Sequence, residues 1–138
     1  MLFLAGCVSL PNRTDGPAEV RSIYVREPAG AADDGMRRCG EVAHDAAVRR
    51  LESMGYRAAA EETEADAVLD GRWEITVGGP LSGRRFVGLN FELRSRAGKV
   101  LFTADVIPLT PVNFLSPDRV REELSDRLAE LGRAPYVR

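Results

Sequence analysis

Histidine, cysteine and tryptophan are scarce in this chain of 138 residues, which has one histidine, two cysteines and one tryptophan. Hydrolytic or nucleophilic catalysis needs a nucleophile, a base and an orienting group within reach of one another. His44 and Cys39 do not supply such a set, and clustered His or Cys ligands for a metal are missing. Paired carboxylates are the one catalytic arrangement that the sequence leaves open. We therefore expect a protein that is not an enzyme and that needs no cofactor or metal.

The sequence also lacks an excess of charge and a long apolar run. Nineteen Lys and Arg face twenty-one Asp and Glu, for a formal net charge of −2 with histidine neutral. The basic residues are scattered, so the electrostatic footprint of a nucleic-acid binder is absent. No apolar run approaches the roughly 18 residues of a membrane-spanning helix. We expect no nucleic-acid partner, and membrane contact only through an anchor or a surface patch.

The N-terminal segment places Leu4, Ala5 and Gly6 directly before Cys7. These residues resemble the lipobox of bacterial lipoproteins, which implies that the Cys7 thiol carries diacylglycerol and that Cys7 becomes the first residue of the mature chain. Val8 follows it in place of an aspartate, and in such lipoproteins this favours the outer membrane. Only six residues precede Cys7, whereas a secretory signal has an apolar region of about 7–15 residues. We expect the true start codon upstream, or a trimmed chain.

Three regions follow from this interpretation. Residues 1–7 are a truncated lipoprotein signal with its lipobox, and residues 8–18, rich in proline, asparagine, aspartate and glycine, are a tether. Residues 19–138 have the balance of a single globular domain, in a chain that is 44% hydrophobic and 29% charged. Lipid on Cys7 leaves Cys39 unpaired, and a lone thiol of this kind is usually buried and inert.

Two amphipathic helices are predicted by apolar residues at helical spacing. In residues 36–54, Asp33 or Asp34 can cap the start and Gly55 ends the helix. Cys39 lies on the side of this helix that faces the protein core, and His44 lies toward its polar side. In the last helix, Ser116 is the cap and Pro117 the first residue. The inward stripes are Cys39, Val42, Ala43, Ala46, Ala47, Leu51 and Met54 in the first helix, and Val120, Leu124, Leu128 and Leu131 in the second.

Alternating residues predict strands at 20–25, 67–77, 85–94 and 100–106, with a short strand at 56–60. In residues 67–77 one face is expected to be buried and the other wet. The acidic stretch 61–66 lacks the spacing of a calcium loop, so a solvated turn is expected. The glycine-rich stretch 78–83 lacks the ending of a phosphate loop and is expected to be a flexible connection.

The last two of the long strands form a hairpin whose loop length is constrained by the side chains. A three-residue loop, 96–98, sets Phe91 opposite Thr103 and places the apolar sets on opposite faces. A four-residue loop, 95–98, sets Phe91 opposite Phe102 and keeps the apolar sets together. Because a one-residue slip flips every side chain, we expect the four-residue loop, usually built around a type I turn.

This order of elements predicts an α+β fold: a two-layer sandwich with a mostly antiparallel sheet of four to five strands and two helices on one face. Residues 51–56, 65–69 and 97–102 resemble small periplasmic lipoproteins of unknown function. A similar element order occurs in the lipoprotein plug of the lipopolysaccharide-assembly translocon and in activator lipoproteins of peptidoglycan synthases. These likenesses concern the fold, which does not imply the function.

The stretch 107–115 is too rich in proline for a strand and unusually apolar for a loop, and exposed apolar patches mark partner or membrane contacts. The alternative is that Val112, Phe114 and Leu115 fold back over the core. The candidate interaction residues are Ile107, Leu109, Val112, Phe114 and Leu115.

Two functions are compatible with these features. The first is a non-catalytic binding or assembly module of the cell envelope, anchored through Cys7 to the periplasmic face of a bacterial membrane and holding an envelope protein as partner. The second is a lipid- or lipopolysaccharide-handling lipoprotein. A cavity between sheet and helices favours the second, whereas a filled core with an exposed apolar loop favours the first. The cations available for lipid phosphates are Arg72, Arg84, Arg85, Arg94 and Arg96, for which Glu74 and Glu92 are the cross-strand alternatives.

Overall fold

The computed structural model describes residues 19–78 and 84–137. The predicted tether, the lipobox and most of the glycine-rich connection lie outside the described residues. The elements in chain order are β1 (Glu19–Val20), β2 (Ser22–Val25), α3 (Asp34–Ser53), β3 (Arg57–Ala58), the 3-10 helix η1 (Glu62–Glu64), β4 (Ala67–Val77), β5 (Arg85–Ser95), β6 (Val100–Pro111), the 3-10 helix η2 (Val112–Phe114), α4 (Pro117–Ala129) and β7 (Tyr136–Val137).

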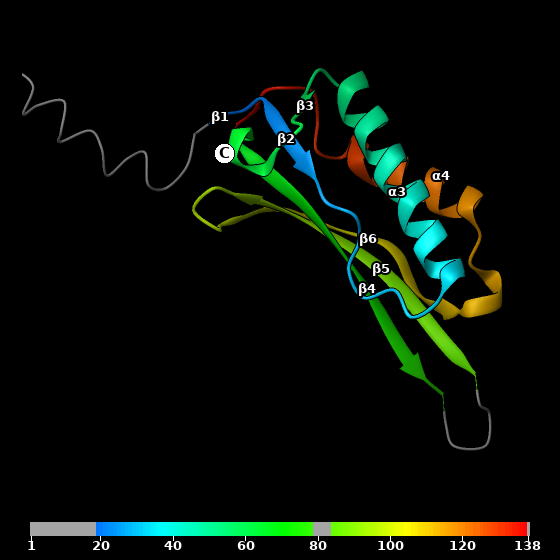
Figure 1. The fold of residues 1–138 in the computed structure, drawn as a ribbon. Coiled ribbons are helices and arrows are strands. Elements are labelled where there is room, and N and C mark those ends of the chain that lie inside the picture. Colours follow the sequence, from blue (N-terminus) through cyan, green and yellow to red (C-terminus); the bar gives the residue numbers. More distant parts are fainter. Residues whose placement is uncertain (1–18, 79–83, 138) are drawn as a thin grey trace, which may run out of the picture.

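A five-stranded sheet in the order β3-β2-β4-β5-β6 forms one layer, and α3 and α4 cover one of its faces (Figure 1). The pairs β4–β5 and β5–β6 are antiparallel and long, whereas β2 pairs in parallel with β3 and β4 over a few residues. A second, two-stranded sheet joins β1 to β7. The predicted α+β sandwich, with two helices on one face of a mostly antiparallel sheet, is confirmed.

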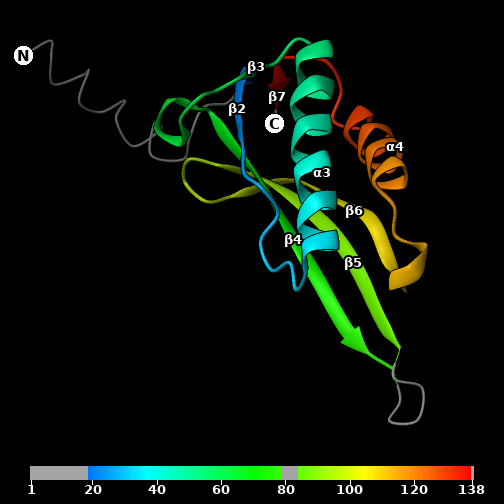
Figure 2. The same ribbon diagram turned by 45° about the vertical axis from the view of Figure 1, so that its right-hand side comes forward.

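The strand directions also make the two helices run side by side in the same direction. Strand β2 is parallel to β4, and β6 is parallel to β4 because β5 reverses the chain between them. Helix α3 follows β2, and α4 follows β6 and η2. Both helices run in the direction opposite to these strands, along the same face of the sheet (Figure 2).

The helix ends are fixed by local interactions, as the sequence predicts. Asp33 caps α3 by accepting a hydrogen bond from the Met36 amide at 2.8 Å. Ser116 caps α4 by accepting from the Arg119 amide at 3.2 Å. Each of these bonds satisfies one of the backbone donors that a helix start leaves free.

Buried apolar side chains fill the space between sheet and helices. The core includes every residue of the predicted stripe of α4 and most of that of α3, packed against Ile23, Leu69 and Phe91 of the sheet. Gly71 makes room for Phe91, because a Cβ on Gly71 would lie 2.7 Å from a carbon of the Phe91 ring. The interior between the two layers is therefore occupied by side chains.

The hairpin of β5 and β6 differs from the prediction: Phe91 lies opposite Ala104 and not opposite Phe102. The turn is also shorter than expected, because the Ser95 amide donates to the Lys99 carbonyl at 2.8 Å. Three residues lie between them, and the last is a glycine with φ of 88°. This left-handed conformation is one that glycine adopts without steric cost.

A bulge in β6 restores the phase that a three-residue turn would otherwise lose. Arg94 pairs with Val100, whereas its neighbour Leu93 pairs with Phe102, so Leu101 is an extra residue in β6. A bulge of this kind shifts the register by one and returns the following side chains to the other face. Phe102 and Ala104 consequently share the face of Leu93 and Phe91 toward the helices, as the sequence pattern predicts. Val100, which the same pattern assigned to this face, lies before the bulge opposite Arg94 and is 40% exposed, so the prediction is wrong for Val100.

Candidate functional site

The stretch 107–115, predicted as an apolar loop, is not a loop in the structure. Strand β6 continues to Pro111, and η2 follows directly. The prolines fit because β6 is an edge strand with β5 as its one neighbour, and proline is tolerated at sheet edges and bulges. A register shift beside Ile107 marks such an irregularity. The exclusion of a strand here is therefore wrong.

The five candidate interaction residues of this stretch divide into two groups. Ile107 is 1% exposed and belongs to the core, and Val112 and Leu115 are half-buried and pack against it. Leu109 and Phe114 are 51% and 62% exposed. Part of the stretch thus folds back over the core, and the remainder faces solvent.

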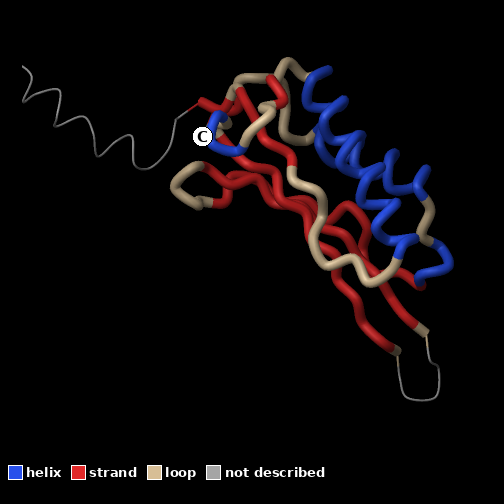
Figure 3. Tube along the Cα trace, viewed as in Figure 1, coloured by secondary structure: helices blue, strands red, loops and turns tan. Residues whose placement is uncertain are grey.

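Strand β4 adds two exposed apolar residues that the sequence pattern assigned to a buried face. Leu69 and Trp73 are buried, but Ile75 and Val77 are 38% and 66% exposed. The reason is geometric, because the ends of β4 and β5 extend beyond the helices that cover the rest of the sheet (Figure 3). The prediction of a fully buried face is wrong for this end of the strand.

These residues gather at one end of the molecule, which we call the hairpin end and define as Ile75, Val77, Phe86, Leu109 and Phe114. Phe86 pairs across the sheet with Thr76 on one side and Pro111 on the other. Within the described residues, six large apolar side chains are exposed, and four of them belong to the hairpin end. The other two, Val100 and Val137, lie elsewhere in the chain.

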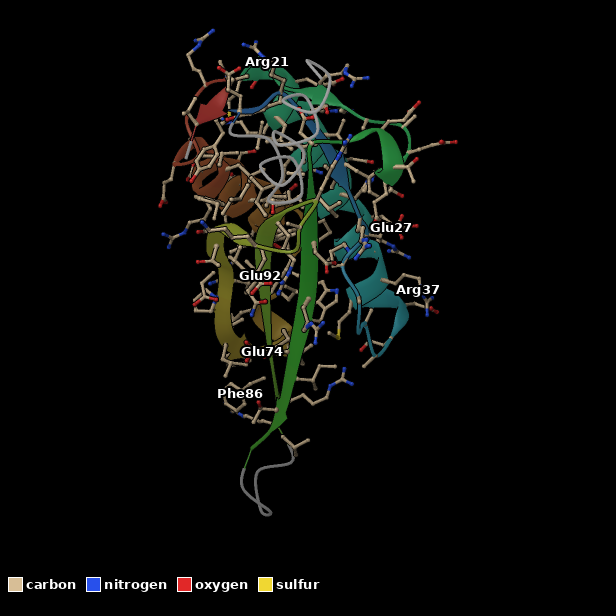
Figure 4. The ribbon with its side chains drawn as sticks, turned by 90° about the vertical axis from the view of Figure 1, so that its left-hand side faces the viewer. Arg21, Glu27, Arg37, Glu74, Phe86 and Glu92 are labelled. Carbon is tan, nitrogen blue, oxygen red and sulfur yellow. The ribbon has the colours of Figure 1, made fainter. Side chains whose placement is uncertain are left out.

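The sheet face away from the helices is polar along most of its length. Figure 4 shows Glu92, Glu74 and Phe86 following one another on this face toward the hairpin end. Leu109 covers Gly88 there, since a Cβ on Gly88 would lie 3.5 Å from the Leu109 Cδ2 atom. The face therefore changes from charged to apolar as it approaches the hairpin end.

Three of the five arginines considered as cations for lipid phosphates already bind groups of the protein. The Glu74 carboxylate accepts a hydrogen bond from the side-chain amide of Asn90 at 2.8 Å and is not a partner of these arginines. The observed pairs are Arg85 with Asp33, Arg94 with Glu92 at 2.6 Å, and Arg96 Nε with the Ala65 carbonyl at 2.7 Å. These pairs favour the structural interpretation of the arginines over lipid binding.

Cys39 and His44, the two residues considered for nucleophilic catalysis, both lie on α3. Cys39 is 4% exposed, and burial raises the pKa of its thiol, which reduces the thiolate available for reaction. His44 is half-buried, with its Nδ1 atom 3.3 Å from a carboxylate oxygen of Asp45. Across residues 19–78 and 84–137, no group of three or more His, Cys, Asp or Glu residues is arranged to hold a metal ion.

The acidic stretch 61–66 is exposed from Glu61 to Glu64, as expected of a solvated turn. Glu62, although exposed, pairs with Arg26 at 2.6 Å. The Asp66 carboxylate accepts hydrogen bonds from the backbone amides of Arg21 at 2.9 Å and Ser22 at 3.1 Å, which join the start of β4 to β2.

The lipobox of Leu4 to Cys7 lies outside the described residues, so lipid attachment at Cys7 stays a prediction. No helix in the part of the chain that the structure describes has the length and hydropathy needed to span a membrane.

Together, these features define a class of fold and surface: an α+β sandwich with a filled core and one exposed apolar end. No protein-family model matches the sequence, and no curated protein matches it. Solved structures do share the fold. The PelC dodecamer from Paraburkholderia phytofirmans in space group P6 superposes with a TM-score of 0.55 at 22% identity, over 86% of this chain and 94% of that chain.

Two further solved structures are similar to this chain. A point variant of the PelC dodecamer in space group C2 gives the same TM-score of 0.55 at 22% identity, over 87% of this chain and 94% of that chain. Lipoprotein GNA1162 from Neisseria meningitidis superposes with a TM-score of 0.48 at 20% identity, over 83% of this chain and 97% of that chain. At these identities, the likeness to PelC shows a common fold.

Proposed function

We propose that this chain is a lipid-anchored, non-catalytic assembly module on the periplasmic face of a bacterial membrane, with the outer membrane favoured. The observation that carries the proposal is the contrast between a filled core and an apolar hairpin end, where Leu109 and Phe114 are more than half exposed. Exposed apolar patches of this kind mark contacts with protein partners or membranes.

The proposed location at the membrane is supported by the lipobox at Leu4 to Cys7 and by Val8 after it. The described chain begins with β1, which lies at the opposite end of the molecule from the hairpin end (Figure 1). The chain thus enters the described fold at the end opposite the hairpin end, which we propose to be the end that other proteins contact.

The partner that we propose first is another copy of this chain. PelC, which shares the fold over most of both chains, is described as a dodecamer. Its fold is thus compatible with assembly of many copies. Apolar side chains at the hairpin end would be covered by neighbouring copies in such an assembly, which removes their surface from water.

Lipid handling, the alternative function, receives less support from the interior. A lipid carrier needs a cavity that buries most of the acyl chain. Here the facing sides of the sheet and the helices are filled by core residues such as Phe91, Leu51 and Leu124. The filled interior favours a protein partner.

Site-specific photo-cross-linking in the native host tests the proposal. The chain is expressed behind a complete lipoprotein signal peptide, with a photoreactive phenylalanine at Leu109 or Phe114. We expect cross-linked species at multiples of the chain mass in the membrane fraction. The matched control is Val100, which is apolar and 40% exposed but lies outside the hairpin end, and it should give none.

Three results would contradict parts of the proposal. Equal cross-linking from Val100 would overturn the role of the hairpin end. A cross-link to a different envelope protein would keep the binding role and overturn self-assembly. The anchor would be overturned by an intact mass equal to that of an unacylated chain beginning at Met1, in a protein that does not sediment with membranes.

A further inference from the structure

A groove of about 330 Å³ lies between α3 and α4, the two helices that run side by side (Figure 2). It is on the helical layer, away from both the hairpin end and the polar face of the sheet. Four of its polar lining residues are potential hydrogen-bond donors to a ligand: Arg49 and Arg50 from α3, and Arg121 and Ser125 from α4.

The groove is basic, although the whole chain has a net charge of −2. Three guanidinium groups line it against a single carboxylate, Asp45. Arg121 is paired with Asp118 at 2.7 Å. Within residues 19–78 and 84–137, no ion pair of 4.0 Å or less involves Arg49 or Arg50. Among the described residues, Arg49 and Arg50 therefore have no carboxylate in direct ion-pair contact.

Arg50 carries a second, independent signal. Its Nε atom is buried and has no hydrogen-bond acceptor among the described residues. The neighbouring hydroxyl of Ser53 donates to the Arg50 carbonyl at 2.6 Å, so this proton is directed away from a ligand and the Ser53 oxygen keeps its lone pairs. The Trp73 Nε1 atom, outside the groove, is likewise buried without a partner among the described residues. Buried donors are nearly always paired in native proteins, and an exception calls for an explanation such as strain, an ordered water or a bound ion.

The helix dipole explains part of this arrangement but not all of it. Arg50 lies in the last turn of α3, where a cation is favoured by the partial negative charge of the helix end. That attraction needs only the charge and leaves the buried Nε donor without an acceptor. It also does not account for a second uncompensated guanidinium, Arg49, beside the first.

We propose that this groove binds a phosphate group. Guanidinium groups bind phosphate through paired, charge-assisted hydrogen bonds, and Arg49, Arg50 and Arg121 present such groups from two helices. The Ser125 hydroxyl is an additional donor on the opposite wall. Several donors around one small volume match the tetrahedral oxygens of a phosphate ester, whether it is a soluble ester or the headgroup of a membrane lipid.

This site goes beyond the proposed function and does not depend on it. Most of the groove residues of α3 lie in its C-terminal half, and this half is at the same end of the molecule as β1 (Figure 1). A headgroup of the anchoring membrane and a soluble phosphate ester are both able to reach such a position. The two sources differ in whether binding requires a lipid surface, and the experiment separates them.

The first measurement is a titration of the full chain with inorganic phosphate, followed by amide shifts in NMR spectra, with Cys7→Ser to prevent acylation. We expect saturable shifts confined to residues 45–53 and 121–125. Arg50→Ala should weaken binding by about tenfold, because a charge-assisted pair is lost. Arg50→Lys keeps the charge but not the planar fork, so its affinity for phosphate should lie between those of the parent chain and Arg50→Ala.

Arg57→Ala is the matched control, because Arg57 is an exposed arginine on β3 outside the groove and its loss changes the net charge equally. It should leave phosphate binding unchanged. The unfolding temperature of each variant shows whether the fold is intact. Shifts spread over the whole surface, or equal losses in the Arg50 and Arg57 variants, would overturn the site.

The second measurement distinguishes the two sources of phosphate. The same unacylated chain is sedimented with vesicles of phosphatidylcholine, with and without phosphatidylglycerol. Binding to the anionic vesicles that requires Arg50 and is displaced by inorganic phosphate supports a lipid headgroup. Phosphate binding without vesicle binding supports a soluble ester. An Arg50-independent result in both measurements would overturn the proposal.

Discussion

The two halves of β4 have the same alternating sequence but opposite surroundings. In the first half, Ala67 and Leu69 are 0% and 1% exposed, whereas near the end of the second half Ile75 and Val77 are 38% and 66% exposed. The helices cover the strand as far as Trp73, because Gly40 in α3 lies close to the Trp73 ring. Alternation therefore shows that a face is apolar, but the position of the helices decides whether the chain itself covers that face.

The largest expected effect separates these halves directly. Leu69→Ala should lower the free energy of unfolding by about 2–5 kcal/mol, because it removes buried surface and leaves a cavity. Val77→Ala should cost about 0.5 kcal/mol or less, as is usual for exposed positions. Urea denaturation of the unacylated protein at low concentration measures both. Equal costs would show that the hairpin end is covered by its own chain.

Two glycines of the covered region sharpen the comparison. Gly71→Ala should destabilise the fold by about 1–3 kcal/mol, because its Cβ would overlap the fully buried ring of Phe91. In Gly40→Ala the nearest heavy atoms are 3.6 Å from the new Cβ. This variant should instead stabilise α3 by about 0.5–1 kcal/mol. Thermal unfolding of the two variants gives the signs, and a harmless Gly71→Ala would contradict the packing described for Phe91.

A smaller effect concerns Asp33, which links the start of helix α3 to the start of strand β5. The pKa of its carboxyl is lowered below the ordinary 3.8. The main cause is the hydrogen bond that it accepts from the Met36 amide, and the second is its pairing with Arg85 at the start of β5. A lowered folded-state pKa stabilises the fold above the unfolded value, and this contribution is lost as pH falls through the folded one.

Comparison with Asp33→Asn measures this effect. The variant keeps a capping side chain but neither the charge nor the titration. Wild type should be the more stable protein near neutral pH, and its advantage should shrink as the pH falls below about 3.8. Urea denaturation across this range supplies the data. A constant difference between the two proteins would contradict the assigned pKa shift.

The sequence predicts both helices well because their signals are local. Asp33 and Ser116 cap the starts through contacts three residues away, and Gly55 and Gly132, with φ of 96° and 85°, follow the ends. The hairpin of β5 and β6 shows the opposite case. Its side-chain phase is predictable, but the shorter turn and the extra residue Leu101 give the same phase by another route, which alternation cannot distinguish.

The candidate site was predictable in part for the same reason. Leu109 and Phe114 stand out as apolar residues among prolines, whereas Ile75 and Val77 continue a pattern that begins in the core. Their exposure depends on where α3 and α4 end relative to the sheet, which is a tertiary property. The basic groove between the helices was not predicted, because Arg49, Arg50 and Arg121 come together only when the two helices pack.

Sedimentation velocity tests most directly whether the hairpin end is a contact between copies. The unacylated full chain carrying Cys7→Ser is compared with the same chain carrying Leu109→Ser and Phe114→Ser, and with Val100→Ser as the exposed apolar control. We predict an oligomer for the parent and for the control, and a monomer for the double variant. A parent that is monomeric at every concentration, or an oligomer that survives the double substitution, would contradict the account.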